Sequence, residues 1–132
     1  MQNLKEADKP LIYSCSGCSS AAQMANAIAL KIDRSGLAEM SCIAGVGGNV
    51  KKLVRLAKSG RKIIAIDGCP LACSKACLAN HQLKPDLHFD LSDYDVPKKN
   101  GQDYNQDQME TVLGKIEHAI KPVVEQCDEI AD

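Results

Sequence analysis

Cysteine is the residue type in this sequence most suited to chemistry, and its spacing is regular in two places. The chain has seven cysteines; Cys69, Cys73 and Cys77 recur at four-residue intervals, and Cys15 and Cys18 form a C-x-x-C pair. Residues four apart lie on one face of a helix, so the first group predicts a helix that carries thiols along one side. Thiolates bind metals or act as nucleophiles, and helix N-termini favour anions. The two groups therefore predict a metal or redox site.

Three kinds of site could use these thiols. A closed zinc site needs about four thiolates in a tetrahedron, with Zn–S distances of about 2.3 Å, and no acid or base. A thiol–disulfide oxidoreductase would use Cys15 and Cys18 as its dithiol, with Cys69 or Cys73 as the resolving thiol. An iron–sulfur cluster on four cysteines is the third hypothesis. The spacing leaves all three open, and zinc is the preferred interpretation.

Composition and charge narrow the class of protein. The chain of 132 residues is 45% hydrophobic and 25% charged, which is typical of one globular domain. A formal net charge of −1 and only four aromatic residues give no basis for nucleic-acid binding. No apolar run approaches the roughly 20 residues of a membrane span, and the polar start does not resemble a signal peptide. We expect a cytoplasmic protein, in which many thiols indicate metal or redox chemistry rather than a disulfide framework.

Strands and helices are expected to alternate along the chain and to position the thiols. Strands are predicted at 11–15, 38–44, 62–66 and 87–91, and helices at 21–32, 50–58, 71–82 and 107–124. This alternation predicts an α/β fold, a small doubly wound parallel sheet of about four strands in the order 2-1-3-4 with helices on both faces. The expected organisation is a flexible lead-in at 1–9, one α/β metal-binding domain at 10–127 and an acidic tail at 128–132. Residues 92–106 are polar and are predicted to form a mobile loop.

Ligands of such folds bind at the carboxyl ends of the strands, at the switch point between strands one and three. Neighbouring strands lie about 4.8 Å apart, so loops that leave them can bring distant residues together. Cys15 and Cys18 follow the first strand, Cys69 and Cys73 follow the third, and Cys42 is predicted to lie on the second. We therefore expect these five cysteines to converge on one metal site.

The order of these motifs resembles that of a known family. Cys15-Ser16-Gly17, a cysteine in the second strand at Cys42, and Ile66-Asp67-Gly68-Cys69-Pro70 followed by Cys73 are similar to the DGC-domain family of zinc-binding proteins. The likeness covers residues 10–90. It implies zinc held by four chelating cysteines, Cys15, Cys42, Cys69 and Cys73. This sequence adds Cys18 and Cys77, so a site that uses Cys18 in place of Cys42 stays open.

The remaining residues predict little further chemistry. No nucleophile–base pair or substrate pocket is evident, which favours a metal-binding protein with a structural, metal-handling or sensing role over an enzyme. Asp67 is expected to hold its loop through backbone N–H groups, Cys77 to pack inward, and Cys127 to be a free thiol in the tail. A basic strip could dock an acidic partner but is predicted to be a solvated helix face; it comprises Lys51, Lys52, Arg55, Lys58, Arg61 and Lys62.

Overall fold

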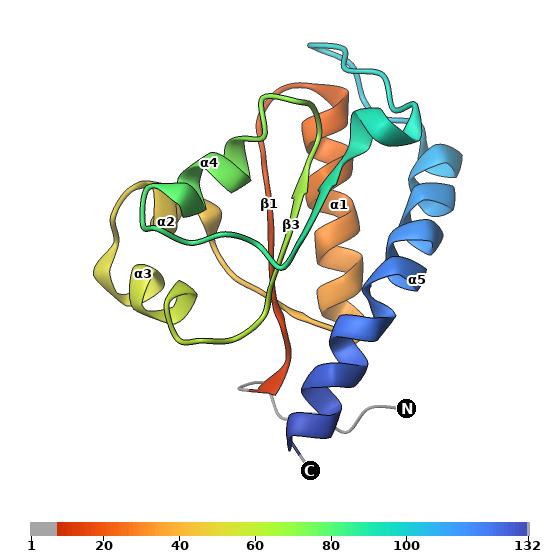
Figure 1. The fold of residues 1–132 in the computed structure, drawn as a ribbon. Helices are drawn as coiled ribbons and strands as arrows, with labels where there is room; N and C mark the ends of the chain where they lie inside the picture. The colour runs from red at the N-terminus through yellow and green to blue at the C-terminus, as the bar shows by residue number, and fades with distance from the viewer. Residues whose placement is uncertain (1–7, 132) are drawn as a thin grey trace.

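The computed structural model describes residues 8–131 and confirms the predicted α/β fold (Figure 1). Its strands are β1 (Leu11–Ser14), β2 (Glu39–Met40), β3 (Ile63–Asp67) and β4 (Leu87–Asp90). All neighbouring strands are parallel, and they form one four-stranded sheet in the order β2-β1-β3-β4. The predicted order is therefore confirmed. The carboxyl ends of β1 and β3, the central pair, meet at one edge of the sheet.

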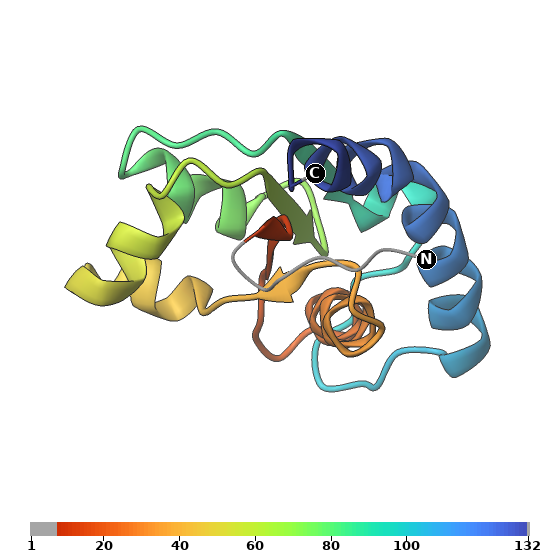
Figure 2. The ribbon, with the colours of Figure 1, turned by 90° about the horizontal axis from the view of Figure 1, so that it is seen from below.

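Helices cover both faces of the sheet, as expected. The helices are α1 (Ser20–Arg34), α2 (Ile43–Gly47), α3 (Lys51–Ala57), α4 (Cys73–Ala79) and α5 (Gln106–Ala131), and a 3-10 turn spans Leu91–Tyr94. Helices α1 and α5 lie on one side of the sheet, and α2, α3 and α4 on the other (Figure 2). In the described part of the chain, no helix has the length and apolar character needed to cross a bilayer.

The two central strands contribute side chains to the hydrophobic cores on both faces of the sheet. Every residue of β1 and β3 is buried, as expected for parallel strands covered by helices on both faces. Successive side chains of a strand point to opposite faces. Ile12 and Ile64 accordingly pack in the core under α1 and α5, while Leu11, Tyr13 and Ala65 pack in the core under α2, α3 and α4. The loops that follow these two strands therefore leave a pair of strands buried on both faces.

The second strand is much shorter than predicted. The expected strand at 38–44 is reduced to β2, and Cys42 lies beyond it as the N-cap of α2. The Cys42 Sγ accepts a hydrogen bond from the Gly45 N–H at 3.4 Å. No helix was predicted between this strand and residue 50, but α2 extends to Gly47 and buries Val46 completely against the sheet. Burial of Val46 favours a helical turn here, and cysteine is not among the residues that usually signal an N-cap.

Two helices begin later than predicted, and a left-handed residue lies one or two positions ahead of each. Asn49 has φ +63°, and Val50 is the N-cap of α3, which begins at Lys51 rather than at residue 50. Ala72 has φ +51° and ψ +53°, so α4 begins at Cys73 rather than at Leu71. Non-glycine residues seldom adopt this conformation, so the sequence gives little warning of either boundary.

The last helix is longer than predicted. It was expected to end near Val124, but α5 continues through Pro122 to Ala131. The predicted tail at 128–132 therefore begins within a helix, and Asp132 lies outside the described residues. Most of the predicted lead-in, residues 1–7, also lies outside them.

Candidate metal centre

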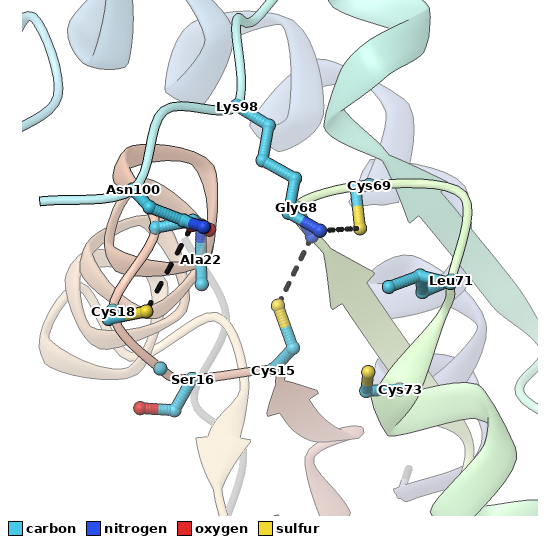
Figure 3. Close-up of a pocket in the computed structure, with 12 residues that line it drawn as sticks. Cys15, Ser16, Cys18, Ala22, Gly68, Cys69, Leu71, Cys73, Lys98 and Asn100 are labelled. Carbon is cyan, nitrogen blue, oxygen red and sulfur yellow. Dashed lines mark hydrogen bonds between the residues drawn. The ribbon is translucent and has the colours of Figure 1, made fainter.

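A pocket with a volume of about 200 Å³ lies at the carboxyl ends of β1 and β3, and four of the five candidate cysteines line it (Figure 3). Cys15 and Cys18 belong to the junction between β1 and α1, and Cys69 and Cys73 to the junction between β3 and α4. The two junctions meet because the ladder between the strands continues past β1, where the Cys15 N–H donates to the Ile66 carbonyl at 3.0 Å. Cys42 does not line this pocket.

Cys15 is the deepest of the four thiols. Its side chain is buried, and its Sγ accepts a hydrogen bond from the Gly68 N–H at 3.2 Å (Figure 3). Burial raises the pKa of Cys15 to about 11, and the nearby Asp67 and Cys73 add to the rise, whereas the Gly68 N–H opposes it. In metal-free protein Cys15 therefore keeps its proton at neutral pH. A cation in the pocket would have to displace that proton.

The other three thiols are more accessible. Cys18 is exposed, and its Sγ lies 4.0 Å from the Asn100 Oδ1. Cys69 is half-buried and accepts a hydrogen bond at 3.4 Å from the Lys98 Nζ, while Cys73 is exposed at the first position of α4. Among the described residues, no three His, Cys, Asp or Glu side chains are already gathered around one point. The thiols surround the pocket without closing it.

Glycine at position 68 lets the two junctions touch. A Cβ at Gly68 would lie 2.6 Å from the backbone carbon of Ala21 and 2.8 Å from the N of Ala22. Real Cβ atoms do not approach backbone atoms this closely, so any larger residue would push the first turn of α1 away from the β3–α4 junction. Gly68 thereby sets the width of the pocket.

The α4 junction is held by one buried carboxylate. Asp67 is 1% exposed and accepts hydrogen bonds from the N–H and Oγ of Ser74, both at 2.8 Å, and from the Lys75 N–H at 3.3 Å. Its Oδ2 also lies 2.8 Å from the His88 Nε2 on β4, a contact that the sequence did not predict. The predicted role of Asp67 in holding its loop is confirmed. Ser74 and His88 both bind Asp67. This order of contacts differs from that of a nucleophilic triad, in which the histidine lies between the serine and the carboxylate and contacts both.

Two residues of the pocket were missed in the sequence. Lys98 and Asn100 lie in the stretch predicted to be a mobile loop, yet both line the pocket, Lys98 beside Cys69 and Asn100 beside Cys18 (Figure 3). The backbone around them is tied to the start of α1: the Ser20 N–H donates to the Lys99 carbonyl at 2.8 Å, and the Lys99 N–H donates to the Ser20 Oγ at 3.0 Å. These contacts of the segment with α1 were not predicted. Contacts between residues nearly eighty positions apart leave no periodic signal in the sequence.

The three remaining cysteines have packing or capping roles. All seven thiols are free. Cys42 caps α2, and the Cys77 Sγ lies 2.9 Å from the position that a Cβ on Gly47 would take, so Cys77 packs against α2 as predicted. Burial raises the pKa of Cys77 and of Cys127. Cys127 is buried on α5 rather than placed in a tail.

Comparison with known proteins identifies the family. A model of the DGC domain matches residues 11–116, a range that contains both junctions. The chain belongs to the DGC-domain family. The "Anaerobic and virulence modulator AnvM" of Pseudomonas aeruginosa (strain PAO1) is 53% identical over 113 residues, which cover 86% of each chain. No match was found among solved structures.

Each residue of the Asp-Gly-Cys motif has a separate task in this DGC domain. Asp67 fixes the start of α4, Gly68 admits the backbone of α1, and Cys69 presents a thiol to the pocket. The family resemblance seen in the motif order is confirmed. The motif therefore shapes the β3–α4 junction and brings its thiols, Cys69 and Cys73, next to Cys15 and Cys18 of the β1–α1 junction.

Proposed function

We propose that this DGC-domain protein binds a zinc ion through the thiolates of Cys15, Cys18, Cys69 and Cys73. The supporting observation is that four thiols from two separate junctions line one small pocket. Thiolate sulfur is a common donor to zinc in structural sites, and the number of thiols matches the four ligands that a closed site uses. The donor set therefore fits the metal that the family implies.

Cys18 is favoured over Cys42 as the fourth ligand. The Cys42 Sγ already caps α2, and recruiting it would leave the Gly45 N–H without that partner. Cys18 is exposed, lines the pocket and follows Gly17, which has φ +135° and open space around it. A junction of this kind can move Cys18 inward without disturbing the sheet. Cys42 is the alternative ligand.

Bound zinc would supply a tetrahedral link between the two junctions and so stabilise them. With four protein ligands the ion keeps no open position for a substrate, which favours a structural, metal-handling or sensing role over catalysis. The relative AnvM is described by its name as a modulator, and we extend a regulatory role of this kind to the chain. We also propose a cytoplasmic location, where the thiols stay reduced.

Elemental analysis of protein purified without chelator tests the proposal. We expect about one zinc per chain, and all seven thiols titratable in denaturant containing EDTA. Cys69→Ser and Cys73→Ser should abolish retention of zinc through dialysis, whereas Cys77→Ser should retain it as the matched control on α4. Cys18→Ser and Cys42→Ser then name the fourth ligand, because only the ligand's loss lowers zinc affinity.

Other outcomes of the same analysis would support the rival functions. Absence of metal, with two thiols detected only after reduction, would overturn zinc binding and indicate a thiol–disulfide oxidoreductase. In that case Cys18 would be the attacking thiol, because the raised pKa of Cys15 makes it a poor nucleophile. Iron together with acid-labile sulfide would indicate an iron–sulfur cluster.

A further inference from the structure

The segment 97–100 presents alternate side chains to two different cavities. Lys98 and Asn100 line the thiol pocket, whereas Pro97 and Lys99 line a separate cavity of about 130 Å³ on the other side. Alternation of this kind is the property of an extended backbone, and Asn100 does form an isolated antiparallel bridge with Ser19. The segment therefore behaves as a short strand whose one face belongs to the thiol pocket.

Hydrogen bonds fix the register of this segment against α1. The Ser20 Oγ donates to the Pro97 carbonyl at 3.1 Å and accepts from the Lys99 N–H, while the Ser20 N–H donates to the Lys99 carbonyl. A shift by one residue would exchange the two faces and turn Lys98 away from the thiols. The backbone on both sides of Lys98 is thus anchored to the helix that follows the Cys15–Cys18 pair.

Lys98 brings a positive charge to this pocket. Its Nζ donates to the Cys69 Sγ at 3.4 Å (Figure 3). Among the described residues that line the pocket, Lys98 alone is cationic. Four thiolates around a divalent cation carry a net charge of about −2, and charge of this kind in a partly buried site needs a partner.

We propose that Lys98 is a positioning residue of the metal centre, which holds the Cys69 thiolate by a charge-assisted hydrogen bond and offsets the negative charge of the cluster. This inference rests on the proposed zinc site and extends the centre to a segment far from the cysteines in sequence. Groups that hydrogen-bond to metal ligands orient them, and their loss lowers metal affinity about 10- to 100-fold. Lys98 thereby couples metal binding to the placement of residues 97–100.

The first test compares neighbouring lysines on opposite faces of the segment. Zinc affinity is measured by competition with a chromogenic chelator for Lys98→Met, Lys98→Arg and Lys99→Met, with the unfolding midpoint of each metal-free variant as a folding control. We expect Lys98→Met to weaken zinc binding about 10-fold. Lys98→Arg should restore most of the affinity, and Lys99→Met should match the wild type. Equal affinities for Lys98→Met and Lys99→Met would overturn the proposal.

The second test needs no metal. In EDTA, the rate of alkylation of Cys69 by anionic iodoacetate is divided by its rate with neutral iodoacetamide, which reports the local electrostatic field. Loss of a cation about 4 Å away should lower this ratio about fivefold in Lys98→Met and leave it unchanged in Lys99→Met. If the protein binds no zinc but Lys98→Met still lowers the ratio, the zinc site is disproved and the Lys98–Cys69 contact is supported. If the ratio is unchanged in Lys98→Met, the Lys98–Cys69 contact itself is disproved.

Discussion

The two junctions that carry the pocket thiols differ in how the helix that follows each of them is capped. Each begins a helix and must satisfy its first backbone N–H groups. At α1 the solution is local, since the Ser19 Oγ accepts from the Ala22 N–H at 3.1 Å. At α4 the N-cap Ala72 offers no side-chain hydrogen bond, and Asp67, at the end of β3, reaches Ser74 instead. One helix is capped by its neighbour in sequence and the other by its strand.

The difference assigns the junctions different mechanical roles. The β3–α4 junction is tied to the buried Asp67 and pressed against the backbone of α1 at Gly68. The β1–α1 junction has exposed residues at Ser16 and Cys18 and open space at Gly17. We therefore expect the β3–α4 junction to be rigid and the β1–α1 junction to be adaptable. If the thiols close around an ion, we expect the movement to occur mainly between Cys15 and Ser19.

The largest expected effect is that of Gly68→Ala. The added Cβ would meet the Ala21 carbonyl carbon at 2.6 Å, and a backbone atom in a helix cannot rotate away as a side chain can. We expect the free energy of unfolding to fall by about 3 kcal/mol, measured by urea denaturation in EDTA. Zinc retention should fall as well, because the pocket widens.

Gly114→Ala is the matched control for this change. Gly114 lies inside α5 with nothing within 4 Å of an added Cβ, so alanine should stabilise the helix by about 1 kcal/mol. If Gly68→Ala were as well tolerated as Gly114→Ala, the rigid contact between the two junctions would be disproved.

The next effect separates the two thiols of the β1–α1 junction. In EDTA at pH 8, Cys15 should react with iodoacetamide at least about a hundredfold more slowly than Cys18, because burial restricts access and holds its pKa near 11. Since only the thiolate reacts, the rate at Cys15 should keep rising with pH up to about 11. Peptide mapping of the alkylated protein measures both rates. Equal rates would mean that the junction opens freely enough to expose Cys15.

A smaller loss of stability is expected for Asp67→Asn. The amide keeps the shape of the carboxylate but presents a donor where Ser74 and Lys75 also donate, so the start of α4 loses charge-assisted hydrogen bonds. We expect unfolding to require about 2 kcal/mol less free energy. His88→Gln, which alters only one of the contacts of Asp67, should cost less. A loss for His88→Gln as large as that for Asp67→Asn would place the key contact on β4 instead of α4.

The parts of the fold that follow local rules could be predicted from the sequence. The alternation of strands and helices along the chain predicted the sheet order, and α1 begins within one residue of its predicted start at residue 21. Four thiols could be brought to one pocket because they follow the ends of neighbouring strands. Cys42 was misplaced because its strand ends early and its thiol caps a helix.

The other missed features all depend on tertiary contacts. The cap of α4 comes from a residue on the preceding strand, and Ala72 adopts a left-handed conformation that its residue type disfavours. Lys98 reaches Cys69 only because Ser20 anchors a segment nearly eighty residues away. Propensity and periodicity describe neighbours along the chain, so they do not contain such contacts.

The smallest effect, that of Ser19→Ala, makes the comparison of the two caps quantitative. Removing the Oγ leaves the Ala22 N–H without its partner and should lower the free energy of unfolding by about 1 kcal/mol. Ser16→Ala, at an exposed position of the same junction, should have no effect beyond error in urea denaturation. The loss at Ser19 should be about half that at Asp67, because Ser19 supplies one neutral hydrogen bond and Asp67 accepts several as a buried carboxylate. The opposite order would make the local cap the stronger restraint and move the rigid part of the site to the β1–α1 junction.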